Sequence, residues 1–132
     1  MWVIESRSPA ELDAAFAEVS RQHPLIVLTD NSLQGLADTI IARALAQRLP
    51  TFGSFTLTFA QAGALINYAR DPKEAFQGTA RLLKKVLNGV APADLPVEQP
   101  TKFILAINLK TAKTLGLEIP PTLLARADEV IE

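Results

Sequence analysis

The chain contains no cysteine, one histidine, one tryptophan and one tyrosine among its 132 residues. Without cysteine it can form no disulfide and no thiolate nucleophile, and cysteine usage says nothing about the redox state of its compartment. No apolar run approaches the roughly 20 residues that a membrane-spanning helix needs. The net charge is −1 and the basic residues are scattered, so we expect no nucleic-acid partner.

Catalytic motifs are also missing from the sequence. There is no GxSxG nucleophile elbow and no GxxxxGK[ST] or GxGxxG phosphate-binding loop. The single histidine, His23, stands beside Pro24 without a metal-binding partner nearby in sequence, which favours an exposed helix end over a metal ligand. We therefore expect no enzymatic activity, no cofactor and no metal site.

Apolar residues are plentiful in this short chain. They make up 48% of it, and the mean hydropathy is +0.19, which is high for a small soluble monomer. A chain of this length has a limited interior in which to bury them. Part of the apolar content is therefore expected at an interface with another lobe or another subunit.

Segments typical of strands alternate with segments typical of helices. Strands are expected at residues 2–5, 25–29, 51–52, 64–68 and 103–107. Helices are expected from Pro9, at 33–47, within 55–63, at 72–87, at 110–115, and from Pro120-Pro121 to about Val130. This alternation predicts one α/β domain with a three-layer, Rossmann-like parallel sheet and helices on both faces.

Local signals define two of these elements closely. Ser8 followed by Pro9 is a helix start, and Leu12, Phe16 and Val19 recur at helical spacing as its inward stripe. The run 25–29 is apolar on both faces, as in a buried parallel strand.

Polar residues follow two of the expected strands. Asp30, Asn31 and Ser32 come after the strand at 25–29, and Gly53 and Ser54 come after the strand at 51–52. Ligands of such sheets bind outside the carboxyl ends of the strands, and the helix after Ser32 would direct its free N–H groups there, which suits a carboxylate. The same residues also favour an ordinary turn and helix cap.

The only tyrosine, Tyr68, is a further candidate for the ligand site. A buried tyrosine more often serves packing, with its hydroxyl satisfied, so both interpretations stay open.

Three segments resemble the C-terminal signature of one family of ABC-transporter substrate-binding proteins. They are PVEQPTKF (96–103), NLKTAKTLGL (108–117) and IPPTLLARADEVI (119–131). Looser resemblance extends upstream to the segments 8–16, 25–30, 61–69 and 82–89. Two positions depart from the family pattern that the chain resembles. Gly63-Ala64 stands in place of Gly-Gly, and Asn67-Tyr68-Ala69 in place of Ser-Tyr-Gly.

The resemblance implies a type I periplasmic-binding-protein fold with two lobes joined by a hinge. Residues 1–63 would then belong to the C-terminal lobe, 64–89 would return to the N-terminal lobe, and 90–132 would cross again and finish the chain. By this resemblance we expect that most of the N-terminal lobe has no counterpart in residues 1–132 and that the first residues do not serve as an export signal. The family also implies a periplasmic location, an ABC permease as partner and a small solute, an aromatic amino acid in some members.

Two functions follow from these observations. The first is a solute-binding component of an ABC importer, or a C-terminal part of one, with Asp30, Asn31, Ser32, Gly53, Ser54 and Tyr68 as ligand-binding residues. The second is a non-binding fragment that covers its apolar surface by forming a homodimer, with the segment after Gly63 exchanged between copies.

Overall fold

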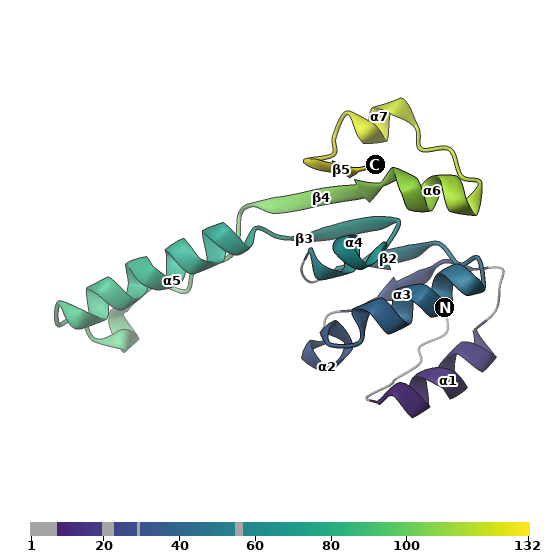
Figure 1. The fold of residues 1–132 in the computed structure, drawn as a ribbon. Coiled ribbons are helices and arrows are strands. Elements are labelled where there is room, and N and C mark those ends of the chain that lie inside the picture. Colours follow the sequence, from purple (N-terminus) through teal and green to yellow (C-terminus); the bar gives the residue numbers. More distant parts are fainter. Residues whose placement is uncertain (1–7, 20–22, 29, 55–56) are drawn as a thin grey trace.

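The computed structural model describes residues 8–19, 23–28, 30–54 and 57–132 and has a five-stranded sheet (Figure 1). The strands are β1 (Leu25–Val27), β2 (Thr51–Gly53), β3 (Ile66–Arg70), β4 (Phe103–Asn108) and β5 (Glu129–Ile131). The helices are α1 (Pro9–Glu18), α2 (Asn31–Gln34), α3 (Ala37–Ala46), α4 (Thr58–Ala62), α5 (Pro72–Leu87), α6 (Leu109–Leu115) and α7 (Pro121–Leu124), with a 3-10 turn at Pro92–Asp94. The predicted α/β class is confirmed. The strand expected at residues 2–5 lies outside the described residues.

The sheet is mostly, but not wholly, parallel. Neighbouring strands follow the chain order β1-β2-β3-β4-β5, and three of the four pairings are parallel. The predicted parallel sheet is therefore confirmed apart from one pairing, because β3 and β4 run antiparallel. The reason is that the chain leaves the sheet at Arg70 and returns at Phe103, directly opposite in the register, so β4 must run back along β3.

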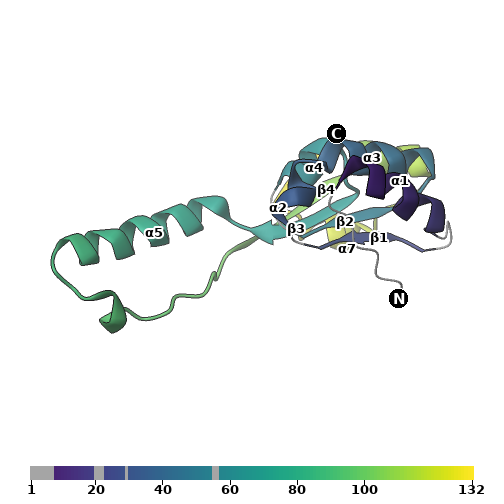
Figure 2. The same cartoon turned by 90° about the horizontal axis from the view of Figure 1, so that it is seen from below.

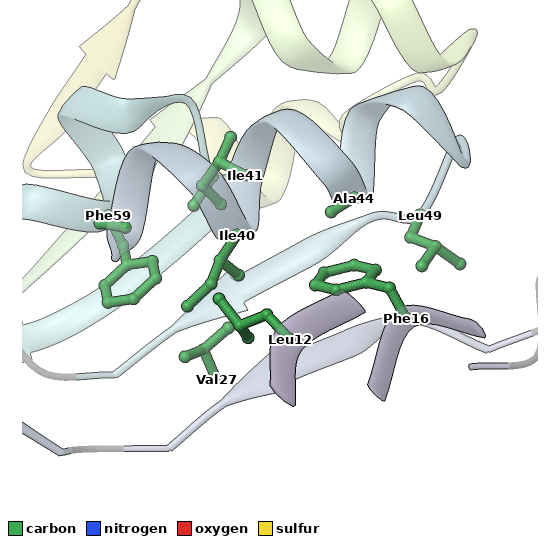
Figure 3. Close-up of a cluster of buried hydrophobic side chains, with 10 residues drawn as sticks. Leu12, Phe16, Val27, Ile40, Ile41, Ala44, Leu49 and Phe59 are labelled. Carbon is green, nitrogen blue, oxygen red and sulfur yellow. The ribbon is translucent and has the colours of Figure 1, made fainter. Parts of the chain in front are cut away.

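One face of the sheet is covered by the helices α1, α3 and α4 (Figure 2). Beneath them lies the hydrophobic core, and the predicted inward residues Leu12 and Phe16 of α1 are both buried in it (Figure 3). The largest fully buried apolar side chains are Ile41 of α3, Leu49 and Ile107. α1 begins as predicted, because the Ser8 hydroxyl accepts a hydrogen bond from the Glu11 amide at 3.3 Å.

The other face of the sheet is largely open, and only the short helix α7 lies on that side in Figure 2. The exposed fraction is 57% for Ile26, 47% for Tyr68 and 41% for Val130. In β1, Val27 points into the core while Ile26 points to this open face. The expectation that the strand at 25–29 is buried on both faces is therefore wrong. Among the described strands β1 lies at the edge of the sheet and is covered on one side, and Thr29 lies outside the described residues.

Residues 71–102, which we call the arm, project from the sheet (Figures 1 and 2). The arm consists of α5, the turn at Pro92–Asp94 and an extended return to β4. No residue of α5 is buried, although the helix has the predicted bounds. It is capped by Asp71, whose carboxylate accepts a hydrogen bond from the Lys73 amide at 2.9 Å. β3 remains in the sheet, so residues 64–70 stay with the body and the projection begins at Asp71.

The C-terminal segment differs from its prediction. Instead of one helix from Pro120 to about Val130, it forms the four-residue helix α7 and then β5. Asp128 explains the change, because its amide donates to the Leu105 carbonyl at 2.9 Å and its carboxylate accepts from the Leu105 amide at 2.8 Å. These two bonds fix the chain against β4, where β-branched Val130 and Ile131 suit a strand.

Candidate functional site

The carboxyl ends of β1, β2 and β3 meet at the edge of the sheet from which the arm leaves. Val27 of β1 pairs with Gly53 of β2, and the Ser54 hydroxyl donates a hydrogen bond to the Val27 carbonyl at 3.1 Å. The structure thus brings the two sequence-predicted segments, Asp30–Ser32 and Gly53–Ser54, to one edge. In open α/β sheets this edge is where ligands bind.

Asp30 acts here as a helix cap. Its carboxylate accepts a hydrogen bond from the Ser32 amide at 2.7 Å and so begins α2. The expected continuous helix at 33–47 is wrong, because α2 ends after four residues and a separate helix, α3, begins at Ala37. The free N–H groups of the longer helix, α3, therefore do not lie next to Ser32 as expected. The polar groups at this edge are instead the exposed side chains of Asp30 and Asn31.

Gly53 lies at the tightest point of the edge. A Cβ placed on it would lie 2.4 Å from Asn67 Oδ1 and 2.7 Å from the Cβ of Phe59, closer than such atoms approach in proteins. Glycine is therefore required by the close approach of β3 and α4. This close approach explains why a glycine stands at position 53, which is buried.

Asn67 is the polar residue that sequence reasoning did not select for the site. It is 0% exposed, pairs with Gly53 in the sheet, and neither its amide nitrogen nor its side-chain oxygen has a hydrogen-bond partner in the described part of the chain. A buried carboxamide without partners is rare and needs an explanation. The one signal in the sequence was the change noted above, in which Asn67 replaces the serine of the family pattern that this segment resembles.

Tyr68 lies apart from the other candidates. It is on the open face of the sheet, and its ring stacks on Phe103 with 5.2 Å between the centroids and 14° between the planes. The contact with β4 gives it a packing role, and its 47% exposure leaves the other side of the ring accessible.

The base of the arm is held by a group of polar contacts, the arm clasp, made of Asp71, Glu74, Thr101 and Lys102. Lys102 Nζ lies 3.0 Å from Asp71 Oδ2, and the Glu74 carboxylate accepts from the amides of Thr101 at 3.1 Å and Lys102 at 2.9 Å. The hydrogen bond to Lys102 lowers the pKa of Asp71, and the same bond raises the pKa of Lys102. The hydrogen bond from the Thr101 hydroxyl lowers the pKa of Glu74.

These pKa shifts predict how the clasp responds to pH. Because folding lowers the pKa of Asp71 and Glu74, their stabilisation is present above the ordinary values of 3.8 and 4.5 and is lost as pH falls through the lowered values. The contribution of Lys102 is complete below its ordinary 10.5 and is lost as pH rises through the raised value. We expect the melting temperature to fall more steeply below about pH 4 in the unaltered chain than in Asp71→Asn, which retains a good helix cap without the charge. Melting curves between pH 7 and pH 3 test this, and parallel pH profiles would contradict it.

Other kinds of site find no support in the described residues. No group of three acidic, histidine or cysteine side chains there is placed to hold a metal ion. No helix among them combines the length and the apolar character needed to cross a membrane. A surface hollow of about 310 Å³ lies between α1 and α3, lined by Asp13, Phe16 and Arg43 among others, on the outer helical layer and not at the strand ends.

The family of this chain is shown by a family model that matches nearly its whole length. The family model of the ABC transporter substrate binding protein matches residues 6–131. The chain belongs to this family. ABC transporter substrate-binding proteins are solute-binding transport components and typically act outside the cytoplasmic membrane. The resemblance seen in the C-terminal signature is thereby confirmed.

Solved structures agree with this assignment. A conserved domain protein from Vibrio cholerae is 27% identical with a TM-score of 0.83, over 92% of this chain and 41% of that one. The ABC domain in complex with L-Trp from Streptococcus pneumonia is 26% identical with a TM-score of 0.79, over the same shares. The ligand-free, open structure of CD0873 from Clostridium difficile shares the fold, with 21% identity, a TM-score of 0.65, and coverage of 94% and 41%. Among curated proteins, none matches the chain.

The chain spans less than half the length of each of these solved relatives. It corresponds to one part of a larger substrate-binding protein. The activity of a whole substrate-binding protein is therefore a proposal for this chain.

Proposed function

We propose that this chain is the C-terminal part of a periplasmic solute-binding component of an ABC importer and supplies one wall of the cleft that holds the solute. The observation that carries the proposal is the meeting of Asp30–Ser32 and Ser54 at the carboxyl edge of β1 and β2 in a member of this family. The arm leaves the sheet at the same edge. Residues 71–102 would therefore belong to the opposite lobe or its hinge, and the permease would recognise the closed form.

An amino acid is the solute that this edge suits best. Carboxylate and hydroxyl groups at Asp30 and Ser54 complement an ammonium group and a polar head. One of the related structures is a complex with L-Trp, which makes L-tryptophan the first probe. Closure on the solute would shift an equilibrium between open and closed forms.

Thermal unfolding with L-tryptophan tests this function. A ligand that binds only the folded state stabilises it by about 2.7 kcal/mol at a concentration 100 times its Kd. We expect a concentration-dependent rise in melting temperature with L-tryptophan and none with an uncharged sugar. An unchanged melting temperature with every amino acid would contradict solute binding by this chain alone.

Asp30→Asn identifies the contribution of the carboxylate. Asparagine caps a helix as well as aspartate does, so α2 remains while the charge is lost. Because a hydrogen bond to a charged group contributes about 1.5–3 kcal/mol, we expect at least a tenfold weaker response to L-tryptophan. Glu118→Gln, which removes a carboxylate from the exposed segment between α6 and α7, serves as the charge-matched control. Equal affinities in the two variants would remove Asp30 from the site.

A second candidate function is self-association without solute binding. It is favoured by the open face of the sheet and by α5, which together leave eight large apolar side chains exposed. This candidate predicts a homodimer whose melting temperature does not respond to amino acids.

A further inference from the structure

Helix α5 carries an apolar stripe that nothing in the described chain covers. Phe76, Leu83 and Leu87 are 77%, 55% and 78% exposed. Their spacing of seven and four residues places them on one side of the helix, together with Ala80. Such a stripe is the part of a helix that normally packs against a sheet or another helix.

The opposite side of α5 is already occupied by the return of the arm. Arg81 forms an ion pair with Glu98 at 2.6 Å, and Glu74 binds the backbone of Thr101 and Lys102. These contacts hold the extended return on the polar side of the helix. The apolar stripe therefore faces away from the chain's own return segment.

The open face of the sheet is a second apolar surface, and it lies apart from the stripe. It consists of five side chains, each at least 40% exposed: Ile26, Leu28, Tyr68, Phe103 and Val130. In α/β proteins both faces of the sheet are normally packed against helices. Within the described residues, one face of this sheet has little helical cover, and the amphipathic helix α5 packs on no sheet.

We propose that the α5 stripe covers the open sheet face of a second copy of this chain, in a two-fold dimer that exchanges arms. The inference rests on the self-association given above as the second candidate function, and it names the surfaces that meet. A two-fold axis brings each stripe onto the other copy's sheet in the same contact, so both apolar surfaces of both copies are covered at once. The projection of the arm away from its own sheet makes the helix available to a partner (Figures 1 and 2).

The dimensions of the two surfaces agree. The 16 residues of α5 extend about 24 Å at 1.5 Å per residue, and five strands about 4.8 Å apart span about 19 Å. The eight side chains expose roughly 900 Å² per copy, taking about 200 Å² as the full area of a large side chain. A stable interface buries about 800 Å² per partner, so the two surfaces supply the apolar area that a dimer needs.

Solution mass and substitutions in α5 test the association itself. Light scattering during size exclusion should give a dimer at micromolar concentration. Leu83→Lys should weaken the dimer at least tenfold, whereas Gln77→Lys, which adds the same charge to the polar side of the same helix, should leave it unchanged. Leucine, glutamine and lysine have similar helix propensities, so α5 persists in both variants. A monomer at every concentration, or an equal effect of the two variants, overturns the proposal and leaves solute binding untouched.

Cross-linking tests which surfaces meet, and the absence of native cysteine makes it specific. Leu83→Cys would be mixed with Ile26→Cys, Phe103→Cys or Val130→Cys in a second copy. A disulfide between copies in at least one mixture is expected, because only Cα atoms within about 7 Å are linked. If Leu83→Cys instead links only to itself, α5 pairs with α5 of the partner, and the arm exchange is wrong although the dimer stands.

Discussion

Replacing Gly53 with alanine is expected to lower the free energy of unfolding by about 1–3 kcal/mol, the usual range for overpacking a close-packed interior. The new Cβ would lie 2.7 Å from the Cβ of Phe59, an atom held next to its own backbone in α4. It would also lie 2.4 Å from Asn67 Oδ1. Relief at Phe59 requires α4 to shift, because a Cβ cannot move without its backbone. Asn67 Oδ1 is the end of a side chain, but at 0% exposure that side chain has little room to rotate away.

Gly35→Ala is the matched control for this prediction. Gly35 follows α2 with φ of −66°, and a Cβ there would meet only the Ser32 carbonyl at 3.7 Å, an ordinary contact. We expect Gly35→Ala to be neutral or to stabilise by up to about 1 kcal/mol, through the reduced entropy of the unfolded chain. Chemical denaturation of both variants gives the comparison. Equal changes in the two would show that the contact at Gly53 is absorbed without cost.

The substitution also separates two roles of the strand-end segment. Gly53 has no side chain with which to bind a solute, so its part in the site is to let β2, β3 and α4 approach closely. If Gly53→Ala weakens the response to L-tryptophan, the effect should be accompanied by the loss of stability. Asp30→Asn should weaken the response without that loss.

Local sequence signals predicted much of the fold. The expected helix boundaries near residues 9, 63, 72 and 115 were correct. The structure shows why, because Ser8, Gly63, Asp71 and Gly116 each cap or terminate a helix by themselves. The bounds of α5 were predicted fully for the same reason. Such signals act within a few residues and do not depend on the tertiary structure.

Elements that depend on distant contacts were predicted poorly. The antiparallel pairing of β4 follows from the position at which the arm returns, and β5 forms because Asp128 binds the backbone of Leu105. The open face of β1 depends on which helices cover the sheet, and an apolar run alone does not reveal that. The first two of these features are decided by residues more than 20 positions away.

The candidate site was predicted in part. The rule that ligands bind beyond the carboxyl ends of parallel strands correctly brought Asp30–Ser32 and Gly53–Ser54 to one edge. Tyr68 lies on the open face instead, and Asn67 was overlooked because the sequence does not reveal that its neighbours leave it without partners. Whether any of them contacts a solute remains a prediction for the experiments above.

Asn67→Ala is expected to raise the free energy of unfolding by about 1 kcal/mol, which is unusual for a truncation in a buried strand. Both polar groups of this 0% exposed side chain lack partners in the described chain, and burying such a group costs about 1–3 kcal/mol in measured variants. Removing the carboxamide abolishes that cost. The cavity left behind is small, and at about 24 cal/mol per Å³ it offsets only part of the gain.

Asn108→Ala is the control, with the opposite sign expected. Asn108 is also buried, at 5% exposure, but its side-chain oxygen accepts from the Thr111 amide at 2.9 Å and caps α6. Loss of such a cap costs about 1 kcal/mol. The same substitution should therefore stabilise the chain at position 67 and destabilise it at position 108, as measured by chemical denaturation. Destabilisation at both positions would mean that the Asn67 carboxamide is satisfied in solution.

The response of Asn67→Ala to L-tryptophan then tests why the chain retains the destabilising Asn67 carboxamide. Proteins keep destabilising polar groups mainly where function uses them. If Asn67→Ala is more stable but no longer responds to the amino acid, the carboxamide belongs to the solute site and becomes partnered on binding. If the stabilised variant responds like the unaltered chain, Asn67 serves no solute, and the site is confined to the loops that follow β1 and β2.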